Sequence, residues 1–310
     1  MQANIRKTIG RLIGKVNRNP FSKNTEPTMQ DFEAQTRALA AQIELELEEG
    51  HLNFPTSMEI SLRVKQLADD PSSTIDDIVA IVRAEPVLSA KVIRMANSVL
   101  LNPYDTHITS INNAVKRIGL SALRCLAFAV AAEQIVQDHR APHLRKLATD
   151  LWRHSVDVAA WSYAFAYHLR TVNPDTAMLT GMMVDIGQFF LLARAATYPA
   201  LANNINRFSE FMTVWKNPIS RSVLEVFELP DDIVDALDDD TLRNDNWPPE
   251  TLQDIVRVAI LASDMPNPFE RVKPSVPKDD ICTEFDRHQF ITLLDVTRAD
   301  KDAVVSAIYS

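Results

Sequence analysis

The chain has 310 residues, of which 46% are hydrophobic and 24% are charged, as in globular proteins with one large domain or two smaller ones. Its two cysteines, Cys125 and Cys282, lie in unrelated surroundings, which argues against a disulfide framework or a cysteine zinc site and favours a reducing cytosol. The longest central apolar run, Cys125–Ala132, is far shorter than the roughly 18 residues that cross a bilayer. We therefore expect a cytoplasmic protein.

The formal net charge of −9 is unevenly distributed along the chain. The rest of the chain is more acidic than this total, because residues 1–23 contain no acid and six cations: Arg6, Lys7, Arg11, Lys15, Arg18 and Lys23. A body this acidic binds nucleic acid backbone poorly, so no nucleic acid partner is expected. Ile5, Ile9, Leu12 and Val16 recur at helical spacing between the cations. The segment is either a helix that docks on an anionic membrane surface at the inner membrane or on a partner, or a disordered basic arm.

Helical periodicity and capping signals recur along the chain, and we find no convincing alternating strand. Few glycines and many alanines and leucines favour helices as well. The predicted fold class is therefore all-α. We expect helices from the Thr28–Asp31 and Thr74–Asp77 capping boxes, over Met58–Ala68, from Pro86 to Asn97, from Ser110 to Gly119, from Ser121 to Val136, and over Leu147–Leu169, Asp175–Ala195, Ser209–Trp215, Pro218–Phe227, Asp231–Leu237 and Glu250–Ser263.

Several candidate sites are better explained as ordinary surface. His139 and His143 have the i, i+4 spacing of zinc helices, but Pro142 lies between them and no neighbouring Glu supplies a base. The acidic run Asp238–Asp240 is typical of a solvated turn. The chain also has no glycine-rich phosphate loop and no nucleophile elbow.

Two polar residues stand out in apolar helices. His154 lies in "LWRHSVDVAAW", and Asp185 lies in "GMMVDIG" on the next predicted helix. If these helices pack as a hairpin, imidazole and carboxylate can meet and act as metal ligands. Two ligands are too few for a metal site, and the alternative is a buried hydrogen-bonded His–Asp pair.

The segments "EPVLSAKVIRMANS", "AVKRIGLSALR", "LWRHSVDVAAW" and "GMMVDIGQFFLLA", in this order and spacing, resemble the HDOD family, which is related to the HD-domain phosphohydrolases. The resemblance covers about Leu52 to Asp264. It implies two helical lobes and a bacterial signalling or regulatory module, generally without demonstrated hydrolase chemistry. We expect an arm and linker (1–27), an HDOD domain (28–270, with lobes at about 28–140 and 141–270) and a C-terminal extension (271–310).

The resemblance also suggests a degenerate metal site. HD hydrolases bind metal through a His, a His-Asp doublet and a late Asp, which His154, Asp185 and Asp264 match, whereas Val184 replaces the doublet His. Lys216 falls near a further family His, and Asp240 and Thr241 fall where a His or a His pair often follows. Valine has no lone pair, and Lys216 would repel a cation or neutralise Asp185. The site is therefore interpreted as vestigial, with no metal, no cofactor and no catalytic residue.

The sequence thus favours a non-catalytic signal-transduction protein that binds protein partners. The alternative is a metal-dependent HD-type phosphohydrolase acting on a nucleotide or cyclic dinucleotide. In "DHRAPHLRK", between the lobes, the basic residues Arg140, Arg145 and Lys146 are candidates for contacting an acidic protein or a nucleotide ligand. Asn97, in the family's Asn-Ser signature, is interpreted as a structural residue that bonds backbone at a helix end, or alternatively as a partner contact.

Overall fold

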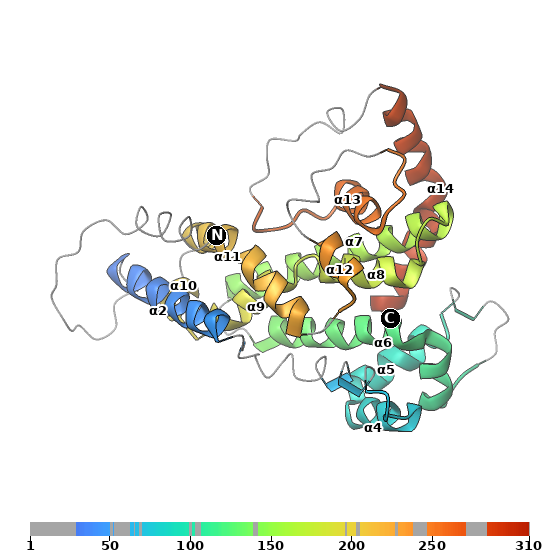
Figure 1. Cartoon of the computed structure of the whole chain (residues 1–310), viewed down its shortest axis with the longest axis horizontal. Coiled ribbons are helices and arrows are strands. Elements are labelled where there is room, and N and C mark those ends of the chain that lie inside the picture. The colour runs from blue at the N-terminus through green and yellow to red at the C-terminus, as the bar shows by residue number, and fades with distance from the viewer. Residues whose placement is uncertain are drawn as a thin grey trace.

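The computed structural model describes residues 29–49, 52, 63–64, 66–67, 70–98, 101–102, 107–138, 142–195, 197–202, 205–226, 229–237, 247–270 and 284–309. Within these ranges the chain is helical and contains no β-strand, so the all-α prediction is confirmed (Figure 1). The basic arm, Arg140, the Asp238–Asp240 run and Thr241 lie outside the described residues. Membrane docking by residues 1–23 stays a prediction.

The first group of helices contains α4 (Ile75–Ala84), α5 (Pro86–Ala96) and the start of α6 (Ile111–Asp138). Helix α4 begins at the predicted capping box, in which Thr74 and Asp77 bond each other's backbone, and Pro86 opens α5. Gly119 interrupts α6 with a φ of 78°, as its predicted role as a helix stop requires. The chain then continues as helix, so α6 runs past the kink into the second group.

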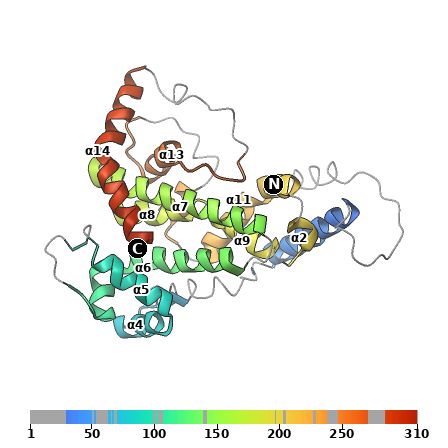
Figure 2. The ribbon, with the colours of Figure 1, turned by 180° about the vertical axis from the view of Figure 1, so that it is seen from behind.

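The second group surrounds α7 (Pro142–Leu169), which is buried along most of its length. Its neighbours are α6, α8 (Pro174–Met183), α9 (Ile186–Ala195) and α13 (Leu252–Ala262), and α11 (Ile205–Val226) packs against α9 (Figures 1 and 2). The short helices α10 (Pro199–Ala202) and α12 (Asp231–Ala236) contact α11. The sequence Pro174–Ala195 is long and apolar enough to cross a membrane, but 83% of its most apolar window is buried inside the protein. It therefore belongs to the protein core.

Two helix predictions were wrong in this group. The segment Asp175–Ala195 is two helices, because the helix breaks at Val184 and Asp185. Conversely, the two helices predicted over Ser209–Trp215 and Pro218–Phe227 belong to one helix, α11, which spans Ile205–Val226 with Pro218 inside it. Proline removes one backbone donor and bends a helix, but a long apolar face can hold the two halves in line.

Two glycines let the helices approach closely on either side of this break. A Cβ atom on Gly181 would lie 2.9 Å from the Cα atom of Ala159 on α7. A Cβ atom on Gly187 would lie 2.5 Å from the backbone oxygen of Lys216 on α11. Neither backbone atom can move aside as a flexible side chain can, so glycine is required at both contacts. The break in "GMMVDIG" is therefore held tightly between α7 and α11.

Two further helices pack outside the parts just described. Helix α2 (Met29–Glu48), which the sequence analysis assigned to the first lobe, lies against α9 and α10 through a bidentate pair between Glu46 and Arg194. Helix α14 (Glu284–Tyr309), in the predicted C-terminal extension, lies along α7 and ends beside α5 (Figure 1). The helical structure of α14 was not predicted from the sequence.

Asn97 ends α5 and joins it to the segment before α6. Its amide nitrogen donates to the carbonyls of Ile93, at 3.0 Å, and Ile108, at 2.7 Å, and its side-chain oxygen accepts from the Ile108 amide at 2.8 Å. One side chain thereby satisfies backbone groups on both segments, which is what the structural interpretation of Asn97 requires.

We predict that Asn97→Ala lowers the free energy of unfolding by roughly 1–3 kcal/mol, because the partly buried backbone groups lose their partner. Asn112→Ala is a matched control, since the Asn112 amide bonds the exposed carboxylate of Asp76. The control should cost less than about 0.5 kcal/mol. Urea unfolding of both variants measures the difference, and equal costs would show that the bonds of Asn97 are not special.

Candidate functional site

Asp185 lies at the break between α8 and α9, where the chain turns into a new helix. Its carbonyl accepts the amides of Gln188 and Phe189, so Asp185 occupies the N-terminal end of α9. Its side chain is only 3% exposed. A carboxylate is favoured at a helix N-terminus by the helix dipole, but burial of the charge still requires direct partners.

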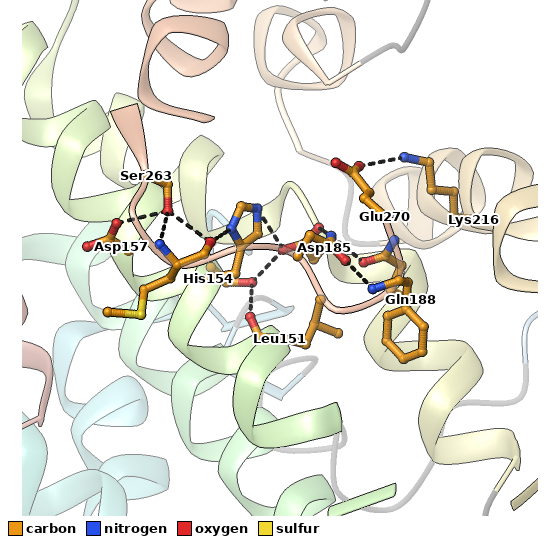
Figure 3. Close-up of polar contacts among 12 residues, drawn as sticks. Leu151, His154, Asp157, Asp185, Gln188, Lys216, Ser263 and Glu270 are labelled. Carbon is orange, nitrogen blue, oxygen red and sulfur yellow. Dashed lines mark hydrogen bonds and ion pairs between the residues drawn. The ribbon is translucent and has the colours of Figure 1, made fainter. Parts of the chain in front are cut away.

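Three side chains supply these partners (Figure 3). The Ser155 hydroxyl on α7 lies 2.9 Å from Oδ2 of Asp185, and the Asn267 amide lies 2.8 Å from Oδ1. The Nε2 atom of His154 is 3.8 Å from Oδ2. Both oxygens of the buried carboxylate are therefore satisfied by groups of the protein itself.

His154, 5% exposed, is held in a single orientation by the segment after α13. Its Nδ1 atom contacts the backbone oxygen of Met265. A carbonyl oxygen only accepts, so Nδ1 carries the proton and Nε2 is directed at Asp185. The predicted meeting of His154 and Asp185 across packed helices is therefore present in the structure.

Burial raises the pKa of Asp185 above its ordinary value of 3.8. The nearby His154 and the hydrogen bond from Ser155 act in the opposite direction and lower this pKa. More distant charges have smaller effects, since Glu270 raises the pKa and Lys216 lowers it. Desolvation is the largest cause of the raised pKa, which means that burial disfavours the ionised form of the carboxylate.

Two other predicted members of the site contact other residues. The side chain of Asp264 is exposed, and its backbone amide bonds Asp157 at 3.3 Å. Lys216 pairs with Glu270, with Nζ 3.3 Å from the carboxylate oxygen (Figure 3). Val184 is half-buried against the apolar core.

The side chains present do not fit a metal ion well. Across the part of the chain that the structure describes, no three His, Cys, Asp or Glu side chains are grouped so as to hold one. The pair His154 and Asp185 provides two ligands, and protein metal sites generally use three or more. The arrangement holds the imidazole of His154 against the carboxylate of Asp185 in a buried polar cluster.

Four polar residues of this cluster were not predicted from the sequence. Ser155 follows His154, Asp157 lies one turn further along α7, and Gln188 and Asn267 join through the Asn267 amide, 2.8 Å from Oε1 of Gln188. A polar residue inside an apolar helix was the available signal for Ser155, Asp157 and Gln188. Nothing local in "DMPNPF" marks Asn267 as part of this cluster, because the partners of its side-chain nitrogen are 79 and 82 positions away.

The remaining predicted residues lie elsewhere on the fold. Arg145 and Lys146 are exposed near the start of α7, and Arg140 lies outside the described residues. Pro142 begins α7 instead of interrupting a helix. The start of α7 therefore presents at least two exposed cations.

The sequence profile of the HDOD domain matches residues 54–239, more than half of the chain. The chain therefore belongs to the HDOD family. Helix α2 and helix α14 lie outside this match. No curated protein matches the sequence.

Solved structures of similar fold cover most of the chain. A protein from Shewanella amazonensis SB2B, named as a proposed metal-dependent phosphohydrolase, has a TM-score of 0.65 at 21% identity and covers 89% of this chain and 99% of its own. An HDOD domain protein of unknown function from Geobacter sulfurreducens has a TM-score of 0.53 at 19% identity, covering 91% and 99%. A proposed signal transduction protein from Marinobacter aquaeolei VT8 has a TM-score of 0.51 at 18% identity, covering 92% and 68%. At these identities the likeness shows the fold alone.

The raised pKa of Asp185 predicts a pH-dependent stability. Above pH 3.8 the folded chain keeps a proton that the unfolded chain has lost, so this stabilisation disappears as pH rises through the folded pKa. Asp185→Asn removes the titration. The variant should therefore gain stability relative to the wild type as pH rises from about 4 to 7. Urea unfolding across this range measures the gap, and a gap that stays constant or closes would contradict the assignment.

Proposed function

We propose that this HDOD protein is a non-catalytic regulatory protein of signal transduction that acts by binding other proteins. The observation that carries the proposal is the internal satisfaction of Asp185. Its two oxygens are bonded by Ser155 and Asn267, and the preceding residue is Val184, where the related HD hydrolases have a ligand. Hydrolysis of a phosphoester by HD chemistry requires that carboxylate to be available to a metal.

A second candidate function is a metal-dependent phosphohydrolase acting on a nucleotide or cyclic dinucleotide. The specific observation in its favour is the orientation of His154. Its Nδ1 atom is bonded to the Met265 carbonyl and its Nε2 atom is directed at Asp185, as in many metal-binding histidines. The Shewanella amazonensis protein is also named as a proposed enzyme of this class. Against it stand the count of two ligands and the bonds that already occupy Asp185.

A binding protein needs a surface that distinguishes its partner. Arg145 and Lys146 are both exposed on the first turns of α7, on a chain with a formal charge of −9. Cations that stand out on an acidic body attract an acidic partner and make the association sensitive to salt. We propose the start of α7 as the site of contact with an acidic protein.

Capture of partners from the native cell tests the proposal. The tagged wild type should retain specific proteins, and Arg145→Glu with Lys146→Glu should reduce their recovery about tenfold or more, because like charges repel across the interface. Lys116→Glu with Arg153→Glu is the matched control, since both positions are exposed cations outside the proposed contact, one on α6 and the other further along α7. All proteins should keep the helical circular dichroism of the wild type.

Two results would count against this function. Equal recovery of partners by both double variants would remove the proposed contact at Arg145 and Lys146. Turnover of a cyclic dinucleotide by the wild type, lost in Asp185→Asn, would establish the phosphohydrolase instead.

A further inference from the structure

A buried carboxylate next to the candidate site connects it to α14. Asp157 lies one turn after His154 on α7 and is 5% exposed. Its Oδ1 atom is 2.7 Å from Nζ of Lys301 on α14. Its Oδ2 atom accepts the Ser263 hydroxyl at 2.8 Å and the Asp264 amide at 3.3 Å (Figure 3). Asp157 therefore joins α7, α14 and the segment that follows α13.

Ser263 links this carboxylate to His154. The Ser263 oxygen lies 2.8 Å from Oδ2 of Asp157 and 3.1 Å from the Met265 carbonyl. A hydroxyl has one hydrogen, so donation to one acceptor is at the expense of the other. The same Met265 carbonyl accepts from Nδ1 of His154. When Asp157 attracts the Ser263 hydroxyl more strongly, the Met265 carbonyl loses that donor. This changes the carbonyl that orients His154.

Lys301 determines how strongly the Asp157 carboxylate attracts the Ser263 hydroxyl. Its side chain is 17% exposed and that of Asp157 is 6% exposed, so solvent screens the pair only weakly. With Lys301 in place, much of the carboxylate charge is compensated. Without it, Asp157 attracts the Ser263 proton and the Asp264 amide more strongly. The position of α14 is thereby communicated to the segment over His154.

The rest of the α14 interface places Lys301 at the centre of an antiparallel helix pair. Tyr309 packs edge-on against Trp152 at 6.4 Å, and Arg298 lies over the ring of Trp161 at 5.8 Å. Near the end of α14, Lys91 of α5 donates to the carbonyl of Ile308. The helix thus touches both groups of helices, and the HDOD match does not include it.

We infer that α14 is a regulatory latch, coupled to the His154–Asp185 pair through a relay of Lys301, Asp157, Ser263 and Met265. Met265 belongs to the relay through its carbonyl, whereas its side chain is 43% exposed. Docking of α14 therefore changes the position of the exposed Met265 segment next to the candidate site. This inference goes beyond the proposed function, and its test needs neither partner nor substrate, so each can fail without the other.

The test compares Lys301→Leu with Arg298→Leu in the full chain. Both remove a cation above Trp161, but only Lys301 touches Asp157. Amide hydrogen exchange over α14 should accelerate about tenfold or more in Lys301→Leu, because an uncompensated buried carboxylate remains. In Arg298→Leu the exchange rate over α14 should change by about threefold or less, because an exposed cation–π contact contributes little stability.

The relay itself is measured at His154. The Nδ1 resonance of His154 in a ¹⁵N-histidine spectrum, assigned by its absence in His154→Gln, should shift in Lys301→Leu and stay in place in Arg298→Leu. Coupling is reciprocal, so His154→Gln should change exchange over α14. In the double variant His154→Gln with Lys301→Leu, the exchange rate over α14 should differ by at least about twofold from the rate that the two single effects predict together.

Ser263→Ala provides a second route if Lys301→Leu does not fold. It breaks the relay without touching α14, and it should change exchange over residues 297–305. Unchanged exchange in Ser263→Ala, or an unmoved His154 resonance in a folded Lys301→Leu protein, would overturn the inference. So would equal responses to Lys301→Leu and Arg298→Leu, because the effect would then be loss of a cation above Trp161 alone.

Discussion

A buried carboxylate cannot remain in a protein core without partners, and the structure around Asp185 follows from that constraint. The break between α8 and α9 places Asp185 at a helix N-terminus. Ser155 approaches it from α7, and Asn267 approaches from the segment after α13. These groups come from three parts of the chain, so satisfying one side chain ties the second group of helices together.

The close packing at the break depends on the absence of side chains as much as on their presence. Gly181 and Gly187 allow α7 and α11 to reach the turn that carries Asp185. After α13, alternate residues point into the cluster: Ser263 reaches Asp157, the Met265 carbonyl reaches His154, and Asn267 reaches Asp185. The segment after α13 thus covers the pair and supplies one hydrogen-bond partner to each of the two side chains.

Much of the fold could be predicted from the sequence, because its signals are local. The capping box at Thr74 and Asp77, the proline that opens α5 and the stop at Gly119 each act within one turn of helix. The pairing of His154 with Asp185 could also be anticipated from adjacent helices. The positions of Asp264 and Lys216 could not, because the segment after α13 turns Asp264 to solvent and brings Glu270 to Lys216. Helix α14 was missed because its stabilising contacts are distant ones, such as Lys301 with Asp157.

Metal content tests the central claim, that Asp185 is satisfied by the protein, most directly. Purified wild type, incubated with Mn²⁺, Fe²⁺, Ni²⁺ or Zn²⁺ and desalted, would be measured by elemental analysis beside His154→Ala. We predict no stoichiometric metal in either protein, since two ligands and an occupied carboxylate bind a cation weakly. About one metal ion per chain in the wild type, lost in His154→Ala, would show a working metal site and contradict the account.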